Sequence, residues 1–261
     1  MFLQRTISSM VFAPLVGFAV YFGGKYFAAL LLAVSFLGAL EYRRLLHQAG
    51  VTIPASFPVV ISLVALLGHT GQPALLLMGL LIGALFFLVL SLFKGGVVEA
   101  LYGLSGHMYL GGLLGALGLL RSGKGGREWA LLVLLVTWAT DVGAYLGGSA
   151  FGKHKLAPKI SPSKSWEGAI CGVLAAGAAG GILSTYLGFS VPFAVGSGLI
   201  LGVLAESGDL AESLLKRFCN AKDSGNLIPG HGGVLDRFDS LLFTGAGGLL
   251  IRLFSSILPS L

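Results

Sequence analysis

The chain has 261 residues, of which 55% are hydrophobic and 11% are charged, and its formal net charge is +6 at pH 7. Soluble domains usually carry about 25% charged residues, and a chain this apolar cannot hide its surface from water in one core. The composition therefore excludes disordered proteins, disulfide scaffolds and simple nucleic-acid-binding proteins, and it predicts a membrane protein.

Apolar segments long enough, or nearly long enough, to cross a bilayer follow one another along the chain. A spanning helix needs about 20 residues. Nine spans are predicted, at residues 7–24, 26–41, 55–71, 73–93, 100–120, 128–148, 168–188, 191–212 and 238–258. The first lacks a small-residue cleavage site before Lys25, so it is interpreted as a retained helix rather than a signal peptide. The expected fold is an all-α polytopic membrane protein, with its chemistry at helix ends and in short loops.

The basic residues are divided unequally between the two sides that nine crossings create. Twelve Lys and Arg side chains fall on one side and four on the other, with Arg252 inside the last span. Since positively charged loops stay in the cytoplasm, the side with twelve is expected to face inward. We divide the chain into N-terminal helices at 1–127, with about five spans, and a catalytic part at 128–261, with about four spans.

Acidic residues are concentrated in the second part, where eight of the eleven lie between positions 141 and 239. Asp141 falls inside an apolar segment, and ionisable residues at membrane depth are candidate functional residues. The alternative is a hydrogen bond that packs helices together. In the segment LAESGDLAESLLKR, helical spacing places Glu206, Asp209, Ser213, Lys216 and Arg217 on one face, with Glu212 to the side. A simple ladder of i,i+4 ion pairs is the alternative there.

Two loops add further polar groups on the same predicted side. Residues 221–240 contain several glycines, whose backbone N–H groups can bind anions, followed by Asp236 and Asp239 one helical turn apart. Residues 151–168 carry four lysines and lead into a helix N-terminus, which favours phosphate. Carboxylates suit Mg²⁺, and Lys and Arg suit phosphates. No P-loop, dinucleotide fingerprint, zinc-protease motif or nucleophile elbow occurs, so metal-assisted phosphoryl or nucleotidyl transfer remains.

The segment SLLKRFCNAKDSGNLIPGHGGVLDRFD at 213–239 resembles the signature of the phosphatidate cytidylyltransferase family, also called CDP-diacylglycerol synthases. The matching residues are Ser213, Lys216, Arg217, Lys222, Asp223, His231, Gly232, Gly233, Asp236, Arg237 and Asp239. Residues 141–168 resemble the family's upstream block. They depart from it at Val142 and Ser165, where the family often has hydroxyl residues or threonine, and at Ser149, where it often has a basic residue.

The resemblance implies transfer of CMP from CTP to phosphatidate, giving CDP-diacylglycerol and pyrophosphate with Mg²⁺, the number of cations staying open. It also implies a homodimer in the cell inner membrane, with a polar cavity open to the cytoplasm and to membrane lipid. No nucleic-acid partner is expected. Carried over by position, Asp209 and Asp236 are the metal carboxylates, with Asp239 as a further ligand and Asp223 in a ligand or orienting role.

The same comparison by position assigns the phosphate-binding groups. Lys216, Arg217, Lys222 and Arg237 would hold phosphates of CTP and phosphatidate, while Asp141, Ser161, Lys164 and Glu167 would line the cavity; Ser213, Gly232 and Gly233 complete the expected substrate-binding set. His231 is interpreted as a donor to phosphate, with a loop-structuring hydrogen bond as the alternative.

Two rival functions remain at this stage. One is a CTP-dependent lipid kinase, or a cytidylyltransferase for another lipid phosphate. The other is an ion-coupled transporter that uses intramembrane carboxylates such as Asp141. Transporters usually show internal repeats, and none is visible here.

Overall fold

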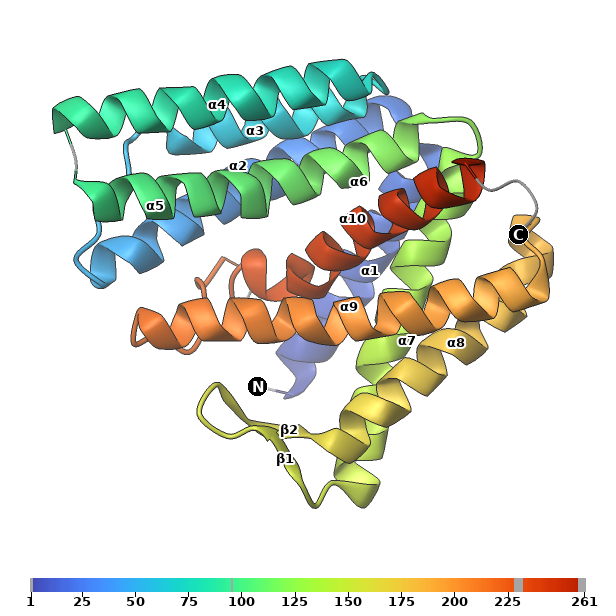
Figure 1. Ribbon diagram of the computed structural model, residues 1–261. Coiled ribbons are helices and arrows are strands. Elements are labelled where there is room, and N and C mark those ends of the chain that lie inside the picture. Colours follow the sequence, from blue (N-terminus) through green and yellow to red (C-terminus); the bar gives the residue numbers. More distant parts are fainter. Residues whose placement is uncertain (1, 95, 228–231, 258–261) are drawn as a thin grey trace. The chain divides into compact units, whose positions relative to one another are not determined.

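A computed structural model describes residues 2–94, 96–227 and 232–257 of the chain, and Figure 1 shows a fold dominated by helices. The helices are α1 (Phe2–Phe22), α2 (Gly24–Gln48), α3 (Phe57–His69), α4 (Pro73–Lys94), α5 (Val97–Gly106), the π-helix η1 (His107–Gly112), α6 (Leu113–Ser122), α7 (Gly126–Phe151), α8 (Trp166–Leu187), α9 (Val191–Phe218) and α10 (Leu235–Ile257). Two strands, β1 (Lys155–Ala157) and β2 (Ser161–Ser165), pair antiparallel.

Each predicted span corresponds to a helix, or, for 100–120, to the continuous run α5–η1–α6. The clearest difference is the second span, predicted at 26–41, because α2 continues to Gln48. The apolar run stops at Glu41 and Arg43, but backbone hydrogen bonding carries the helix through these charged residues. Similarly, α9 extends to Phe218, so the cationic end of the predicted eighth span is helical.

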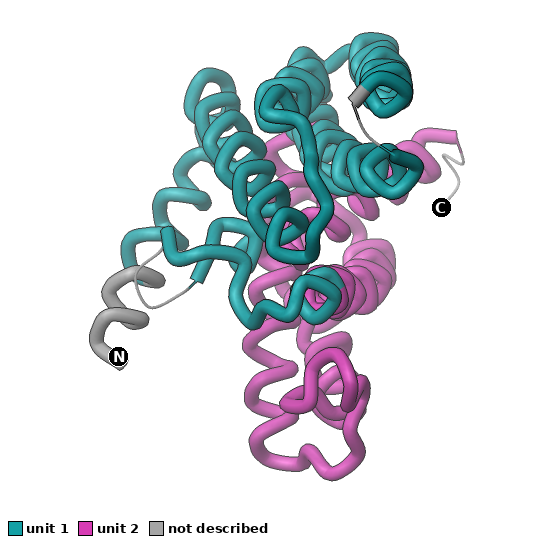
Figure 2. The backbone as a smooth tube through the Cα atoms, turned by 90° about the vertical axis from the view of Figure 1, so that its left-hand side faces the viewer, with its two compact units in different colours: residues 1–124, 215–238 teal, residues 125–214, 239–261 magenta. Residues whose placement is uncertain are grey.

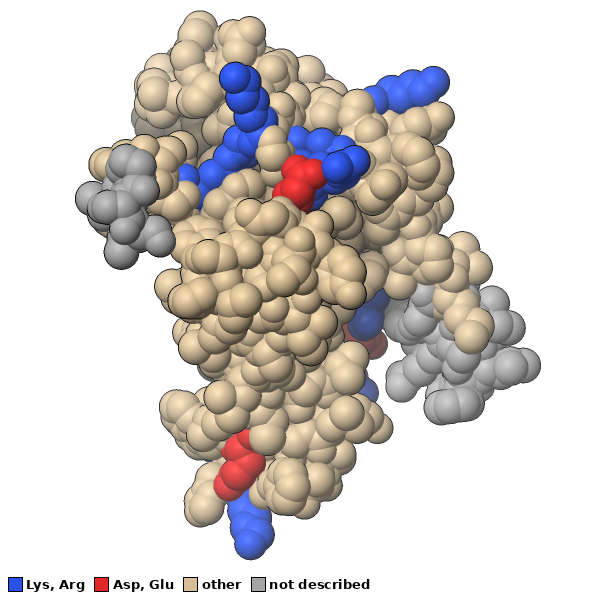
Figure 3. All heavy atoms as spheres, turned by 90° about the vertical axis from the view of Figure 1, so that its right-hand side faces the viewer, with Lys and Arg blue, Asp and Glu red and all other residues tan. Residues whose placement is uncertain are grey.

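The surface and the helix lengths both indicate a membrane environment. On the face shown in Figure 3, few charged side chains interrupt a largely uncharged surface. Large apolar side chains lie open, among them Leu92 at 80% and Ile182 at 70% exposure, which lipid accommodates and water does not. Seven helices within the described ranges are long and apolar enough to cross a membrane, while Met10–Phe22 and Phe57–His69 are shorter apolar helices. The all-α, multi-pass class is thus confirmed, and the number of nine crossings stays a prediction.

The chain divides into two compact units, coloured separately in Figure 2. Unit 1 contains Met1–Lys124 and Leu215–Phe238. In it α3 packs against α2, α4 and α6. Close approach is possible because glycines lie at the contacts; a Cβ on Gly115 would come within 3.3 Å of the Val64 carbonyl oxygen. The end of α9 and the start of α10 belong to this unit, so residues 215–238 of the signature segment fold with the N-terminal helices, whereas Ser213 and Asp239 belong to the other unit.

Unit 2 contains Gly125–Leu214 and Asp239–Leu261. Its main packing is between α7 and α8, and glycine again permits it, since a Cβ on Gly172 would lie 2.9 Å from the Thr140 carbonyl oxygen. The β1–β2 hairpin precedes α8 and was not expected from the sequence. Ser165 ends the hairpin and caps α8, its Oγ accepting a hydrogen bond from Gly168 N at 3.1 Å.

Candidate functional site

Within unit 1, the signature segment is organised around the carboxylate of Asp236, in the first turn of α10. Its Oδ1 is 2.6 Å from Lys216 Nζ at the end of α9, and both side chains are largely buried, at 6% and 11% exposure. Its Oδ2 accepts hydrogen bonds from Gly233 N at 2.8 Å and from Ser224 N at 2.9 Å. Asp236 therefore joins a helix end, a loop and a helix start through one side chain.

The glycines of this loop are required by its geometry. Gly232 has φ +85°, in the left-handed region, and a Cβ there would lie 2.6 Å from Asp236 Oδ2. Gly233 is buried, and a Cβ would meet the side chains of Ser224 and Glu41. Gly232 and Gly233, both predicted substrate-binding residues, are thus required here by the backbone conformation and by the lack of room for a side chain. His231 lies outside the described residues.

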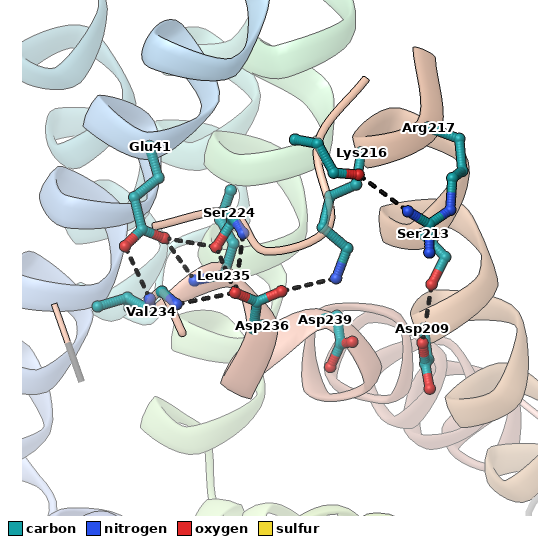
Figure 4. A network of polar contacts seen from close by, with 12 residues as sticks. Glu41, Asp209, Ser213, Lys216, Arg217, Ser224, Val234, Leu235, Asp236 and Asp239 are labelled. Atoms are coloured by element: carbon teal, nitrogen blue, oxygen red, sulfur yellow. Dashed lines mark hydrogen bonds and ion pairs between the residues drawn. The ribbon is translucent and has the colours of Figure 1, made fainter. Parts of the chain in front are cut away.

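Glu41, from α2, completes this cluster and was missed by the sequence analysis. It is 4% exposed, and its carboxylate accepts hydrogen bonds from Val234 N, Leu235 N and Ser224 Oγ at 2.9, 2.9 and 3.0 Å. Figure 4 shows Glu41 and Asp236 on either side of Ser224. The available signal was a single acidic residue near the end of an apolar helix, far in the sequence from the acidic residues concentrated after position 141.

Unit 2 holds a second cluster, built on Lys164 from β2. Its Nζ lies 2.6 Å from Glu206 Oε2 and 2.8 Å from Asp209 Oδ2, both on α9. Burial alone would lower the pKa of the Lys164 ammonium, but the two carboxylates outweigh this, and its pKa lies above the usual value. Lys164 therefore stays charged at neutral pH. Asp209 also accepts a hydrogen bond from Ser213 Oγ at 3.2 Å, as the i,i+4 spacing predicts.

Further carboxylates lie near Asp209. The charges of Asp209, Glu212 and Asp141 all act on Asp239, whose Oδ1 accepts the hydrogen bond of Ser240 N at 2.7 Å. Glu212 is fully buried, although its helical angle places it beside the predicted face, and Asp141 is on an exposed part of α7. The structure thus brings three carboxylates of unit 2 into electrostatic reach of a fourth, Asp239.

The other predicted site residues occupy more open positions. Lys222, Asp223 and Arg237 are exposed, and the exposed Arg217 donates from Nη1 to the Ala221 carbonyl oxygen at 3.1 Å. Ser161 is half-exposed in β2, where it faces Ala157 across the hairpin.

Glu167 binds the two residues that precede the first strand of the hairpin. Its carboxylate accepts hydrogen bonds from the backbone N–H groups of Lys153 and His154 and lies 2.6 Å from His154 Nδ1. Its predicted place in the cavity lining stays a prediction.

The donor chemistry near Asp209 fits a divalent cation. Carboxylate oxygens are the ligands that Mg²⁺ prefers, and Asp209 and Asp239 carry them. In this structure both oxygens of Asp209 contact protein groups, Oδ2 the Lys164 ammonium and Oδ1 the Ser213 hydroxyl. Within the described ranges, no three His, Cys, Asp or Glu side chains are already arranged to hold an ion. Asp236, the other predicted ligand, lies in unit 1 and uses both oxygens in the contacts described above. Its pairing with Asp209 across the two units stays a prediction.

Comparison with known proteins places the chain among its relatives. A profile described as "Cytidylyltransferase family" matches residues 3–254. The phosphatidate cytidylyltransferase of Brucella suis biovar 1 is 35% identical over 97% of this chain and 93% of its own length. Those of Synechocystis sp. and Pseudomonas aeruginosa are 34% and 37% identical over 92% and 91% of this chain, and over 93% and 92% of their own lengths. The resemblance read from the signature segment is confirmed, and it extends through the N-terminal helices.

Proposed function

The chain belongs to the cytidylyltransferase family, and we propose that it makes CDP-diacylglycerol and pyrophosphate from CTP and phosphatidate. It is an integral-membrane, CTP-dependent nucleotidyltransferase of phospholipid biosynthesis. The observation that carries this proposal is the full-length similarity to phosphatidate cytidylyltransferases, together with the intact signature at 213–239.

The reaction requires two highly charged molecules to meet. An oxygen of the phosphatidate phosphate attacks the α-phosphorus of CTP, the new P–O bond forms, and the bond between the α-phosphorus and the bridging oxygen breaks to release pyrophosphate. A phosphate monoester is already anionic near pH 7, because its second pKa is about 6. A strong general base is therefore unnecessary, and the protein's contribution is positioning and charge neutralisation.

The side chains of the two clusters suit these tasks. Lys222, Arg217 and Arg237 are exposed cations, the side-chain type that binds phosphates. Lys216 and Lys164 are instead held by carboxylates, which fixes their ammonium groups in place. Asp209 and Asp239 would hold Mg²⁺, with Asp236 as the further predicted ligand. Bound Mg²⁺ would neutralise phosphate charge and favour departure of pyrophosphate.

The proposal extends to location and assembly. We place the signature loops at the cytoplasmic face of the inner membrane, on the basis of the twelve-to-four distribution of basic residues. The polar cavity, a role for membrane lipid in substrate access, and a homodimer are parts of the same proposal, supported by the family resemblance.

The decisive experiment supplies purified protein with phosphatidate and CTP labelled in the cytidine moiety. We expect labelled CDP-diacylglycerol in the lipid phase and unlabelled pyrophosphate in the aqueous phase. A lipid kinase would release labelled CDP instead, and a cytidylyltransferase for another lipid phosphate would leave phosphatidate unreacted. Either result would contradict the proposal.

The metal assignment is tested by replacing Asp209 with asparagine, which retains the shape but removes the charge. We expect Asp209→Asn to lower Mg²⁺-dependent product formation by at least about 100-fold, because the cation that would stabilise the reacting phosphates loses a charged ligand. Glu128→Gln, which alters a carboxylate at the start of α7 paired with Arg127, is the control and should retain activity. Near-normal turnover in both Asp209→Asn and Asp236→Asn would remove the metal assignment.

A further inference from the structure

Glu41 lies in a position where an ionised carboxylate would be costly without strong partners. It is on α2, 183 residues before the nearest of its partners in the signature segment, and is 4% exposed. Burying a carboxylate is unfavourable unless it is hydrogen-bonded. Glu41 meets this requirement with three donors, all from the segment 224–235. Its carboxylate oxygens are therefore directed toward the part of the signature segment between the end of α9 and the start of α10, called the signature loop below.

Two of those donors lie at the start of α10: Leu235 N is its first N–H group, and Val234 N directly precedes it. The first N–H groups of a helix have no partner within the helix, and a side chain just before it usually accepts one of them. Here the preceding residue is Val234, which has no such oxygen. Glu41 instead accepts from Val234 N and Leu235 N, both at 2.9 Å. A carboxylate at a helix N-terminus is also favoured by the helix dipole. Glu41 thus acts as the cap of α10 from a distant helix.

The third donor connects Glu41 to Asp236. Ser224 Oγ lies 3.0 Å from Glu41 Oε2 and 2.9 Å from Asp236 Oδ2, so the hydroxyl stands between the two carboxylates. The backbone at Gly225 and at Gly233 also lies close to Glu41, because a Cβ on either glycine would collide with its carboxylate. The conformation of the chain at these two glycines is therefore matched to this one side chain.

We propose that Glu41 is a positioning residue for the nucleotidyl transfer reaction, holding Ser224, the start of α10 and through them Asp236 and Lys216 in the arrangement that receives CTP. This inference rests on the proposed function for its activity measurements. Glu41 is not a catalytic residue, because its oxygens are directed to protein donors and its side chain is buried. It gives the N-terminal helices a specific role in the reaction beyond acting as a scaffold.

The test compares Glu41→Ala and Glu41→Gln with Glu99→Gln. Glu99 is a matched control, since it also accepts a backbone N–H next to a helix N-terminus, that of Gly96 at 2.8 Å, but does so at α5. Purified variants are assayed at varied CTP, and rates are normalised to the folded fraction. We expect Glu41→Ala to raise the KM for CTP by about tenfold or more and to lower kcat, because the groups that bind the nucleotide lose their alignment. Glu41→Gln keeps the size but not the charge, and should fall between Glu41→Ala and the control.

A second readout does not depend on activity. Lys222 is exposed within the loop, and Lys159 is exposed in the turn of the hairpin. We expect limited trypsin digestion of Glu41→Ala to cut at Lys222 at least about tenfold faster, while cleavage at Lys159 is unchanged. If the wild type makes no CDP-diacylglycerol, the proposed function fails. The rate of cleavage at Lys222 still tests whether Glu41 keeps the residues around Lys222 in place.

Several outcomes would overturn the inference. One is an unchanged KM and unchanged cleavage at Lys222 in both Glu41 variants. Another is a fall in folded fraction alone, which would mean that Glu41 serves only stability. If Glu41→Ala fails to fold, the KM for CTP and the rate of cleavage at Lys222 are measured in Glu41→Gln alone. Wild-type values of both in Glu41→Gln would contradict the proposal.

Discussion

The ammonium group of Lys164 contacts two carboxylates from α9, and the contribution of these contacts to the free energy of unfolding can be measured. Lys164→Met keeps much of the aliphatic stem but leaves Glu206 and Asp209 without this partner. We expect the free energy of unfolding to fall by about 1.5–3 kcal/mol, the range for hydrogen bonds to charged groups. Adding Glu206→Gln to Lys164→Met should restore part of the loss, because one of two repelling charges is removed.

This prediction is checked by denaturant unfolding in detergent with the two single variants and the double variant, which together give the coupling energy. Lys159→Met is the control, since Lys159 is an exposed lysine in the same hairpin region and its loss should change stability by less than about 0.5 kcal/mol. Additive effects of Lys164→Met and Glu206→Gln would show that the pair contributes nothing specific.

At the scale of the element, the packing of α7 on α8 depends on a glycine contact. A Cβ at Gly172 would lie 2.9 Å from the Thr140 carbonyl oxygen, which is backbone and cannot rotate away. Gly172→Ala should therefore destabilise the protein by about 1–3 kcal/mol. Gly196→Ala, in α9, meets nothing within 4 Å and should be neutral or stabilising, because alanine favours helix by about 1 kcal/mol over glycine. Thermal unfolding followed by circular dichroism compares the two, and equal Tm values would contradict the packing argument.

The helices themselves were predictable because apolar length and local spacing are properties of neighbouring residues. The i,i+4 spacing of Asp209 and Ser213 on a predicted helix is an example, and the hydrogen bond is present. The contact of Lys164 with Asp209 was not predictable, since nothing local connects residue 164 to residue 209. Glu41 is the extreme case, because its partner Leu235 is 194 residues away. The chemical types of the site residues are visible in the sequence, but only tertiary packing determines which of these residues contact one another.

At the scale of the whole molecule, α3 is one of the two short apolar helices on which the number of membrane crossings depends. It has 13 residues, or about 20 Å of helix, against about 30 Å of hydrocarbon. The distribution of basic residues nevertheless favours a crossing. With nine spans it is twelve to four, whereas without α3 all later loops change sides and the division falls to ten to six. Since orientation follows this asymmetry, we expect α3 to cross, with local thinning of the bilayer or burial among neighbouring helices compensating for its length.

Cysteine labelling distinguishes these two topologies. In a variant with Cys171 and Cys219 replaced by serine, single cysteines are placed at the exposed positions Thr52 and Gln72, on either side of α3. If α3 crosses, an impermeant thiol reagent added to intact cells labels Gln72→Cys but not Thr52→Cys, and membrane disruption exposes the latter. Lys124→Cys and Lys159→Cys serve as outside and inside references. Labelling of Thr52→Cys and Gln72→Cys from the same side would remove one crossing, reverse the second half of the chain relative to the first, and contradict the assignment of the twelve basic residues to one, cytoplasmic face.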